Sequence, residues 1–336
     1  MEKYLIADYT SNGYAREPVL AFMPDGTMVC VSLTGGPTEP HNDNVVMITC
    51  SKDKGRTWTE PKVLFSHKQR GVWCTEIFTG GEFPMMIVHT YDGDCPYKEL
   101  QTFVSYTYDN GKTWSVPESM PAHSNGMCIR KGIVMSNGEI LFPVYFTGLE
   151  KGFGDFGKFG NPDFWKGSHH KCAVLISSDR GKSYVPYGCF GNSRHLWEPN
   201  CVELDDGHIL MYMRDTENPK INAAESYDYG RTWRHNGNIE IPNADTKLSM
   251  EKINGKVVLV SNVCESLEFL GRKELQIQVS DDNCKTWRKV AEVAPPDEPW
   301  FYPHTLVDYA NEILYVAYEN GKRHYINKYP FEELRL

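Results

Sequence analysis

The sequence lacks the features that mark membrane and secreted proteins. None of its apolar runs approaches the ~18 residues that a membrane-spanning helix needs. The N-terminal stretch MEKYLIADYTSNGY has no hydrophobic segment of a signal peptide. The ten cysteines include no CxxC pair, which is consistent with reduced side chains that act as small hydrophobes. We therefore expect a cytoplasmic protein without membrane contact, or a secreted one if a leader has been removed.

The net charge and the motifs of the sequence bear on two further questions, nucleic-acid binding and the use of a metal or organic cofactor. Acidic residues number 44 and basic residues 35, for a net charge of −9, and no basic stripe interrupts this balance, so we expect no nucleic-acid partner. The sequence shows neither a ligand-spaced His, Cys and Asp cluster nor a phosphate-cradling glycine loop. We accordingly expect no metal or organic cofactor. The composition leaves the oligomeric state open.

An eight-residue signature recurs five times along the chain. Its pattern is S/T-x-D-x-G-x-T/S-aromatic, known as the Asp box. In such a turn the Asp side chain accepts backbone N–H groups, Gly adopts positive φ, and the aromatic residue packs beneath. The fifth copy has Cys284 in place of Gly, so we expect that turn to be strained or reshaped. The copies are SKDKGRTW (51–58), TYDNGKTW (107–114), SSDRGKSY (177–184), SYDYGRTW (226–233) and SDDNCKTW (280–287).

A second repeat precedes the boxes by about thirty residues and consists of two apolar stretches around a short turn. Such pairs are typical of β-hairpins, so each unit reads as hairpin, loop, hairpin: the four strands of one propeller blade. Six units fill residues 15–330 and predict a single all-β domain over residues 1–336. The expected fold is a six-bladed β-propeller with four-stranded antiparallel blades. The sixth unit lacks a box, and its outer strand is expected from RHYINKY or from the N-terminal segment.

Chemically useful residues gather at one predicted face of this ring. Counting nine residues back from the hairpin turn gives Glu17, Glu198 and Tyr302 in three units, each followed by proline. These positions lie where the first strand of each blade starts beside the axis. Function on rigid scaffolds is usually carried by loops at one end. The other candidates at this end are Arg16, Arg214, Arg272, His41 and Asp43.

Several segments resemble the sialidase (neuraminidase) superfamily, and the resemblance covers the whole chain. The matching stretches are YAREPVLAFMPDGT, WEPNCVELDDGHILMYMR, GRKELQIQVSDDNCKTW and FYPHTLVDYANEILYVAYENG. By this resemblance, three arginines would bind a substrate carboxylate, Tyr302 would be the nucleophile and Glu198 its base. Asp43 would be the general acid, with His41 as the alternative. The three arginines are Arg16, Arg214 and Arg272.

The resemblance implies an exo-glycosidase that hydrolyses a terminal carboxylate-bearing sugar, above all α-linked sialic acid, and retains the configuration at the anomeric carbon. The anomeric carbon of that sugar carries a carboxylate, which would repel a carboxylate nucleophile; sialidases use a tyrosine instead. The sequence departs from the family where Glu17 replaces an Ile after the first arginine. Two roles are open for Glu17: it binds a substrate hydroxyl, or it holds Arg16 in place.

Two other functions are open at this point. In a propeller lyase or other uronate-acting enzyme, an arginine would neutralise the uronate while Tyr302, His41 or His304 abstracts a proton. A non-catalytic propeller would bind an acidic glycan without turnover. Arg70, Arg130 and Arg194 are further candidates for the arginine set. The insertion FTGLEKGFGDFGKFGNPDFWKGSHHK is a candidate lid; its His169 and His170 are interpreted as solvated loop residues rather than metal ligands.

Overall fold

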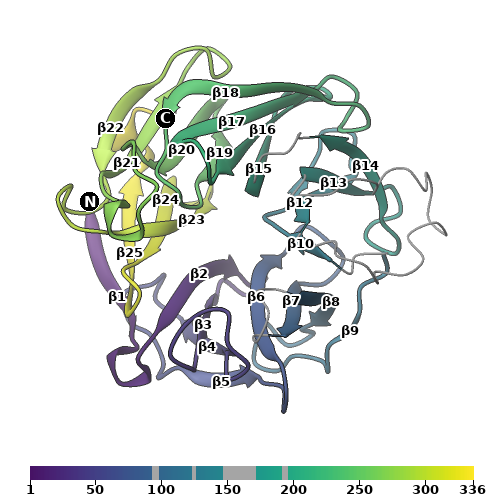
Figure 1. Ribbon diagram of the computed structural model, residues 1–336, viewed down its shortest axis with the longest axis vertical. Coiled ribbons are helices and arrows are strands. Elements are labelled where there is room, and N and C mark those ends of the chain that lie inside the picture. Colours follow the sequence, from purple (N-terminus) through teal and green to yellow (C-terminus); the bar gives the residue numbers. More distant parts are fainter. Residues whose placement is uncertain (93–97, 123–125, 147–171, 191–195) are drawn as a thin grey trace.

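Six small antiparallel sheets surround a common axis in the computed structural model (Figure 1). The structure describes residues 1–92, 98–122, 126–146, 172–190 and 196–336. Each sheet is one blade, and its first strand lies closest to the axis. The predicted six-bladed β-propeller with four-stranded blades is confirmed, and the third blade departs only in having its inner strand broken into β10 and β11.

The first three blades run outward from the axis in chain order. The first consists of β2 (Ala15–Phe22), β3 (Met28–Thr34), β4 (Val45–Ser51) and β5 (Lys62–Phe65). The second consists of β6 (Gly71–Phe78), β7 (Met85–Asp92), β8 (Lys98–Tyr106) and β9 (Glu118–Ser119). The third consists of β10 (Met127–Ile129), β11 (Ile133–Val134), β12 (Ile140–Phe146), β13 (Cys172–Ser177) and β14 (Val185–Phe190).

The last three blades complete the ring. The fourth consists of β15 (Leu196–Asp205), β16 (His208–Asp215), β17 (Lys220–Ser226) and β18 (Arg234–Pro242). The fifth consists of β19 (Ser249–Ile253), β20 (Lys256–Asn262), β21 (Leu275–Ser280) and β22 (Arg288–Glu292). The sixth consists of β23 (Phe301–Asp308), β24 (Ile313–Glu319), β25 (Arg323–Pro330) and β1 (Glu2–Asp8). Short helical turns are η1 (Thr10–Asn12), η3 (Phe269–Gly271) and α1 (Phe331–Leu334).

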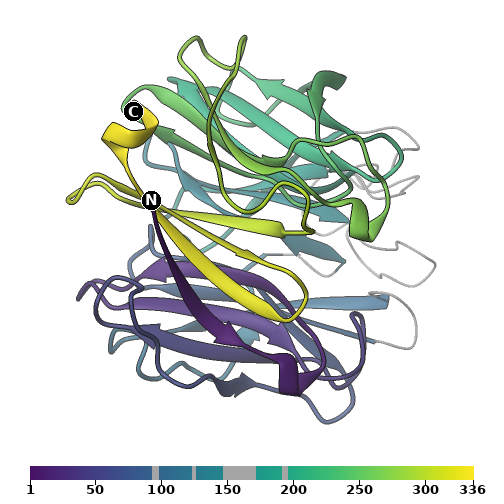
Figure 2. The same ribbon diagram turned by 90° about the vertical axis from the view of Figure 1, so that its left-hand side faces the viewer.

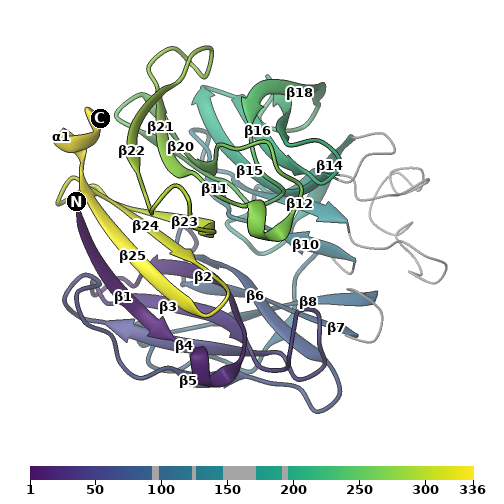
Figure 3. The same ribbon diagram turned by 60° about the vertical axis from the view of Figure 1, so that its left-hand side comes forward.

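The N-terminal strand closes the ring. β1 pairs antiparallel with β25, so the first residues of the chain form the outer strand of the last blade, and RHYINKY forms the third. Figures 2 and 3 show β1 lying along the C-terminal strands. Both segments proposed from the sequence are therefore used. Because β1 covers the edge of β25, that strand is not left open to pair with another chain.

Apolar side chains fill the interfaces between neighbouring blades. Between the fourth and fifth blades, for example, Val202 and Leu210 belong to the same buried cluster as Val257 and Leu259. Equivalent clusters lie between the other blades. This packing gives a rigid frame for the loops at its ends. None of the helices in the described ranges is long and apolar enough to cross a membrane.

The Asp boxes form the expected turns. In the first box, the Asp53 carboxylate accepts hydrogen bonds from the side-chain hydroxyl of Thr57 at 2.6 Å and from its backbone N–H at 2.9 Å. The hydrogen bonds from Thr57 hold the pKa of Asp53 below its ordinary value. In the fifth box, Cys284 adopts φ = 66° and its N–H still donates to Ser280 Oγ at 2.9 Å. The turn is thus kept rather than reshaped, with a cysteine in the left-handed region that glycine normally occupies.

Candidate active site

Three inner strands begin with the same backbone irregularity. The pairing of β2 with β3, of β15 with β16 and of β23 with β24 slips by one residue near the start of each inner strand. At each slip a non-glycine residue adopts left-handed φ: 51° at Glu17, 48° at Glu198 and 56° at Tyr302. Such backbone costs about 1–3 kcal/mol and gathers at functional sites. The equivalence of these three positions, inferred by counting along the sequence, is therefore seen in the backbone.

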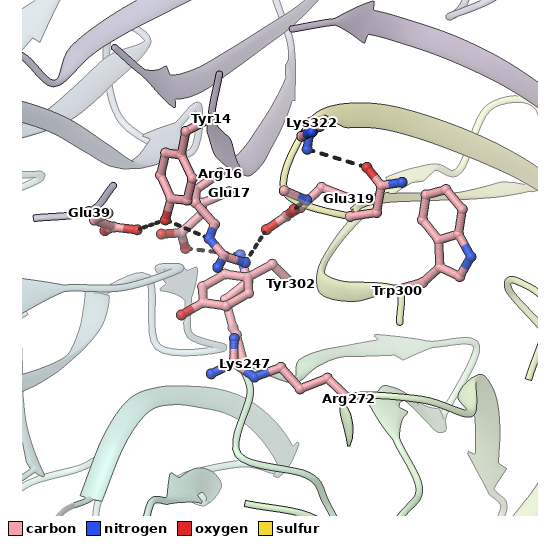
Figure 4. A network of polar contacts seen from close by, with 12 residues as sticks. Tyr14, Arg16, Glu17, Glu39, Lys247, Arg272, Trp300, Tyr302, Glu319 and Lys322 are labelled. Atoms are coloured by element: carbon pink, nitrogen blue, oxygen red, sulfur yellow. Dashed lines mark hydrogen bonds and ion pairs between the residues drawn. The ribbon is translucent and has the colours of Figure 1, made fainter. Parts of the chain in front are cut away.

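Tyr302 lies at the centre of a cluster of charged side chains. Arg214 Nη1 donates to Tyr302 Oη at 3.2 Å and to Glu198 Oε2 at 3.0 Å, so one guanidinium bridges the phenol and the carboxylate. The guanidinium carbon of Arg16 lies 5.6 Å from the centre of the Tyr302 ring, and that of Arg272 lies 5.8 Å from it. Figure 4 shows the ring between Arg16 on one side and Arg272 on the other. The three arginines, from three different blades, thus meet around one tyrosine.

The groups around Tyr302 shift the pKa of its phenol in opposite directions. Burial raises the pKa of Tyr302 above its ordinary value, and the Glu198 carboxylate raises it further. Arg214 and Arg272 lower it. The net pKa stays raised, so the resting phenol holds its proton. A nucleophilic role for this oxygen therefore needs a base that removes the proton during the reaction.

Asp245 orients two of the arginines. It lies in the segment before β19, and its carboxylate accepts a hydrogen bond from Arg214 Nε at 2.5 Å and pairs with Arg272 Nη2 at 3.6 Å. Arg272 Nε is buried without a hydrogen-bond partner among the described residues. Burial lowers the pKa of Arg272, and the neighbouring arginines add to this effect. Arg272 is thus the least neutralised of the three cations.

Arg16 is held by two side chains that the sequence did not single out. Its Nη1 donates to Glu319 Oε1 at 3.1 Å, and its Nε donates to Tyr14 Oη at 2.6 Å. Tyr14 in turn donates to Glu39 Oε2 at 3.0 Å (Figure 4). Burial raises the pKa of Glu319 to about 7, while Arg16 opposes the shift. Glu319 is the last residue of β24, the second strand of its blade, and Arg214 lies near the end of β16, the second strand of another blade. This shared position is the signal in the sequence that could have pointed to Glu319 as a site residue.

Glu17 does not hold Arg16, contrary to one of its two expected roles. Its side chain is 1% exposed, and its carboxylate accepts hydrogen bonds from Arg130 Nη2, from Lys247 Nζ at 3.0 Å and from Trp73 Nε1 at 2.9 Å. Three donors therefore occupy both oxygens. Glu17 belongs to a buried ion cluster next to Tyr302, because Lys247 Nζ also lies 5.7 Å from the Tyr302 ring centre.

The candidate acids lie at the rim of the site. Asp43 is 77% exposed and lies 3.5 Å from His41 Nδ1, on the loop between β3 and β4. Within the described ranges, Asp43 makes no hydrogen bond or ion pair with the arginines, Glu198 or Tyr302. Glu39, on the same loop, does reach the cluster through Tyr14 and acts electrostatically on Tyr302. The structure therefore brings the loop, rather than Asp43 itself, against the arginines.

The remaining candidates lie elsewhere. Arg70 donates to Thr90, and Arg130 is committed to Glu17, so neither joins the three arginines around Tyr302. His304 is buried, with Nε2 3.2 Å from the Leu20 carbonyl oxygen, and burial lowers its pKa well below the ordinary value. This placement disfavours His304 as a proton-abstracting base. Arg194, His169, His170 and residues 147–171, which make up all of the insertion after its first residue, lie outside the described residues.

Comparison with known proteins identifies the family. The model of the BNR repeat-like domain matches residues 97–313, well over half of the chain. The chain belongs to this BNR repeat-like family. Its propeller is of the sialidase kind, as the resemblance in the sequence indicated.

Curated relatives and solved structures place this BNR-repeat propeller near sialidases. It is 24% identical over 249 residues to a sialidase of Paraclostridium sordellii, covering 66% of the chain and 57% of that protein. A sialidase of Bacteroides fragilis strain YCH46 is 22% identical over 286 residues, covering 79% and 48%. The chain thus spans about half the length of these relatives. The solved Hadza microbial sialidase Hz136 superposes with a TM-score of 0.77 at 15% identity, covering 99% of the chain and 69% of that structure.

Proposed function

We propose that this protein is an exo-glycosidase that removes a terminal, carboxylate-bearing sugar, α-linked sialic acid above all, from glycans. The observation that carries the proposal is the meeting of Arg16, Arg214 and Arg272 around Tyr302, with Glu198 joined to the phenol through Arg214. The sialidase names of the relatives support the same substrate class.

The arginines would bind the sugar carboxylate. Planar guanidinium groups donate pairs of parallel hydrogen bonds to carboxylates, and such charge-assisted bonds are about twice as strong as neutral ones. The three arginines are buried, with side chains that are 8–9% exposed, so water competes weakly for them. Glu319 and Asp245 orient the guanidiniums before substrate arrives. This arrangement would place the anomeric carbon, which bears the carboxylate, beside Tyr302.

Tyr302 would then attack that carbon. As its oxygen forms the new bond, the phenolic proton passes to the Glu198 carboxylate and the glycosidic bond breaks. The departing oxygen takes a proton from the acid on the β3–β4 loop, for which we propose Asp43. In the second half-reaction water replaces the tyrosine, and the acid and base exchange roles. Two displacements at one carbon give retention of configuration.

Substrates with different leaving groups show whether Asp43 or His41 is the general acid. A phenol with a low pKa departs without proton donation, whereas a sugar alcohol needs it. In Asp43→Asn we expect kcat/KM on a natural sialoside to fall about 10²- to 10³-fold, and on a nitrophenyl sialoside much less. His41→Gln should leave both rates within a few-fold of wild type. The reverse pattern would assign the acid to His41.

The function itself is tested by release of a fluorophore from an aryl α-sialoside, run beside an aryl β-glucuronide and an unsulfated uronate polymer. We expect release from the sialoside alone. Ultraviolet absorbance of an unsaturated product from the polymer would indicate a lyase instead. Saturable binding of sialyllactose without any turnover would indicate a glycan-binding propeller.

A further inference from the structure

One aromatic side chain that the proposed chemistry does not use lies against two of the three arginines. Phe269 belongs to η3, on the loop between β20 and β21 that also carries Arg272. The centre of its ring lies 4.3 Å from the guanidinium carbon of Arg16 and 4.8 Å from that of Arg272. Both distances are inside the ~6 Å over which the face of an aromatic ring attracts a cation. A single ring therefore contacts cations from two different blades.

The ring of Phe269 rests on a buried neighbour. It packs edge to face against Phe301, with the ring centres 5.1 Å apart, and Phe301 is 1% exposed. The guanidinium carbons of Arg16 and Arg272 also lie 4.8 Å and 5.5 Å from the centre of the Phe301 ring. The two cations thus share a pair of aromatic rings, one anchored in the core and the other on the loop.

The loop that carries Phe269 is tied to the site through Asp245. The Asp245 N–H donates to the Ser266 carbonyl oxygen at 2.9 Å, and the Glu268 N–H donates to Ser266 Oγ at 3.2 Å. The Asp245 carboxylate in turn pairs with Arg272. The ring of Phe269 is therefore placed by the same contacts that place the acidic partner of Arg272.

An aromatic ring can hold these arginines in a way that a further carboxylate could not. A carboxylate pairs with the N–H groups at the edge of a guanidinium and would occupy donors that the substrate carboxylate needs. A ring contacts the face of the planar group and leaves those N–H groups free. Among the residues that the structure describes, Arg272 has one acidic partner, Asp245, at 3.6 Å.

We propose that Phe269 is a positioning residue of the carboxylate-binding site, whose ring holds the guanidiniums of Arg16 and Arg272 without engaging their N–H groups. The inference rests on the proposed function, in which these arginines bind the sugar carboxylate. Phe269 contacts the arginines rather than the reacting atoms. It therefore contributes to affinity for the acidic sugar and not to the chemical step.

Stepwise fluorination of the Phe269 ring tests this role while keeping an apolar ring in place. Each fluorine withdraws electron density from the ring face and so weakens its attraction for a cation. Phenylalanine with one, two or three ring fluorines is incorporated at position 269 of the full chain, and binding of a sialic acid analogue is measured by calorimetry. We expect affinity to fall stepwise, about 10-fold over the series. On an aryl α-sialoside KM should rise while kcat stays within a few-fold of wild type.

Two ordinary substitutions and a control accompany the series. Phe269→Leu keeps an apolar side chain but no ring, and should lose about 10-fold in affinity, whereas Phe269→Trp supplies a ring that attracts cations more strongly and should keep the affinity. The control places the same fluorinated residues at Phe83, an exposed phenylalanine that packs on Tyr108 of the second Asp box. It should leave affinity unchanged.

The order of the arginine side chains gives a readout that needs no substrate. Nitrogen NMR relaxation follows the Nε–H groups of Arg16 and Arg272, with their signals assigned through Arg16→Lys and Arg272→Lys. We expect Phe269→Leu to increase the mobility of both groups on the picosecond-to-nanosecond timescale, and Phe269→Trp to preserve their order.

A loss of affinity graded by fluorine number, with kcat kept and the arginines more mobile in Phe269→Leu, supports the inference. Loss in Phe269→Leu without any gradation in the fluorinated series overturns it, because the ring would then serve only as packing. Unchanged affinity and unchanged arginine order in all variants also overturn it. If the wild-type protein neither binds the analogue nor turns over the sialoside, the proposed function fails, whereas the mobility of Arg16 and Arg272 still decides the role of Phe269.

Discussion

Tyr302→Phe is expected to reduce turnover of an aryl α-sialoside by at least about 10³-fold while leaving binding of a sialic acid analogue within a few-fold of wild type. The variant removes only the phenolic oxygen, which the mechanism uses as nucleophile. The ring remains, so the contacts of Arg16 and Arg272 with its face are kept. Turnover by steady-state kinetics and affinity by calorimetry together separate loss of chemistry from loss of the site.

The matched control is Tyr309→Phe, which removes an exposed hydroxyl that donates to the Lys252 carbonyl at 2.9 Å, remote from the arginines. It should leave both turnover and affinity unchanged. Tyr302→Phe with ordinary kcat would exclude the tyrosine as nucleophile, even if the substrate class stands.

Arg272→Gln is expected to weaken binding of the same analogue about 100-fold. A hydrogen bond to a charged group contributes about 1.5–3 kcal/mol, and the substrate carboxylate would lose both the charge and the paired donors of this side chain. Arg272 is the arginine whose neutralisation is weakest, since its partner Asp245 lies 3.6 Å away and is shared with Arg214. Calorimetric titration measures the loss directly.

Arg272→Lys and Arg288→Gln make that result specific. Lysine keeps the charge but not the planar pair of donors, so we expect an intermediate affinity. Arg288 pairs with Asp281 on the surface at 3.1 Å, and its substitution should not change affinity. An Arg272→Gln protein that binds the analogue as tightly as wild type would remove this residue from the carboxylate clamp.

The fold was predictable because its signal is repeated and local. Each Asp box specifies its own turn through contacts within eight residues, and the hairpin before it has apolar strands around a turn. Even Cys284 in place of Gly did not break the pattern, because its N–H keeps the bond to Ser280. The pairing of β1 with β25 joins the two ends of the chain. From the sequence, two segments remained as candidates for the outer strand of the sixth blade.

The site was predictable where a residue stands at a repeated position, and not where a partner comes from elsewhere. Glu17, Glu198 and Tyr302 share one place in three blades and one backbone conformation. Asp245 and Lys247 lie in a segment without a motif, and only the closed ring brings them to Arg214 and to Glu17. Glu319 lies in a stretch that resembles the family, but its contact with Arg16 likewise depends on the closed ring. The hypothesis that Glu17 holds Arg16 was wrong. The two residues are neighbours in the sequence, but their side chains contact different partners.

The central claim, that Tyr302 forms a bond to the sugar, is tested most directly by trapping that bond. A sialosyl fluoride carrying a second fluorine beside the anomeric carbon should react with the protein and then hydrolyse slowly, because the added fluorine destabilises the positively charged transition state. Mass spectrometry is expected to show one added sugar per chain, located on the peptide that contains Tyr302 and absent from Tyr302→Phe. A sugar attached to Glu198 or another carboxylate, or turnover with inverted product and no adduct, would contradict the account.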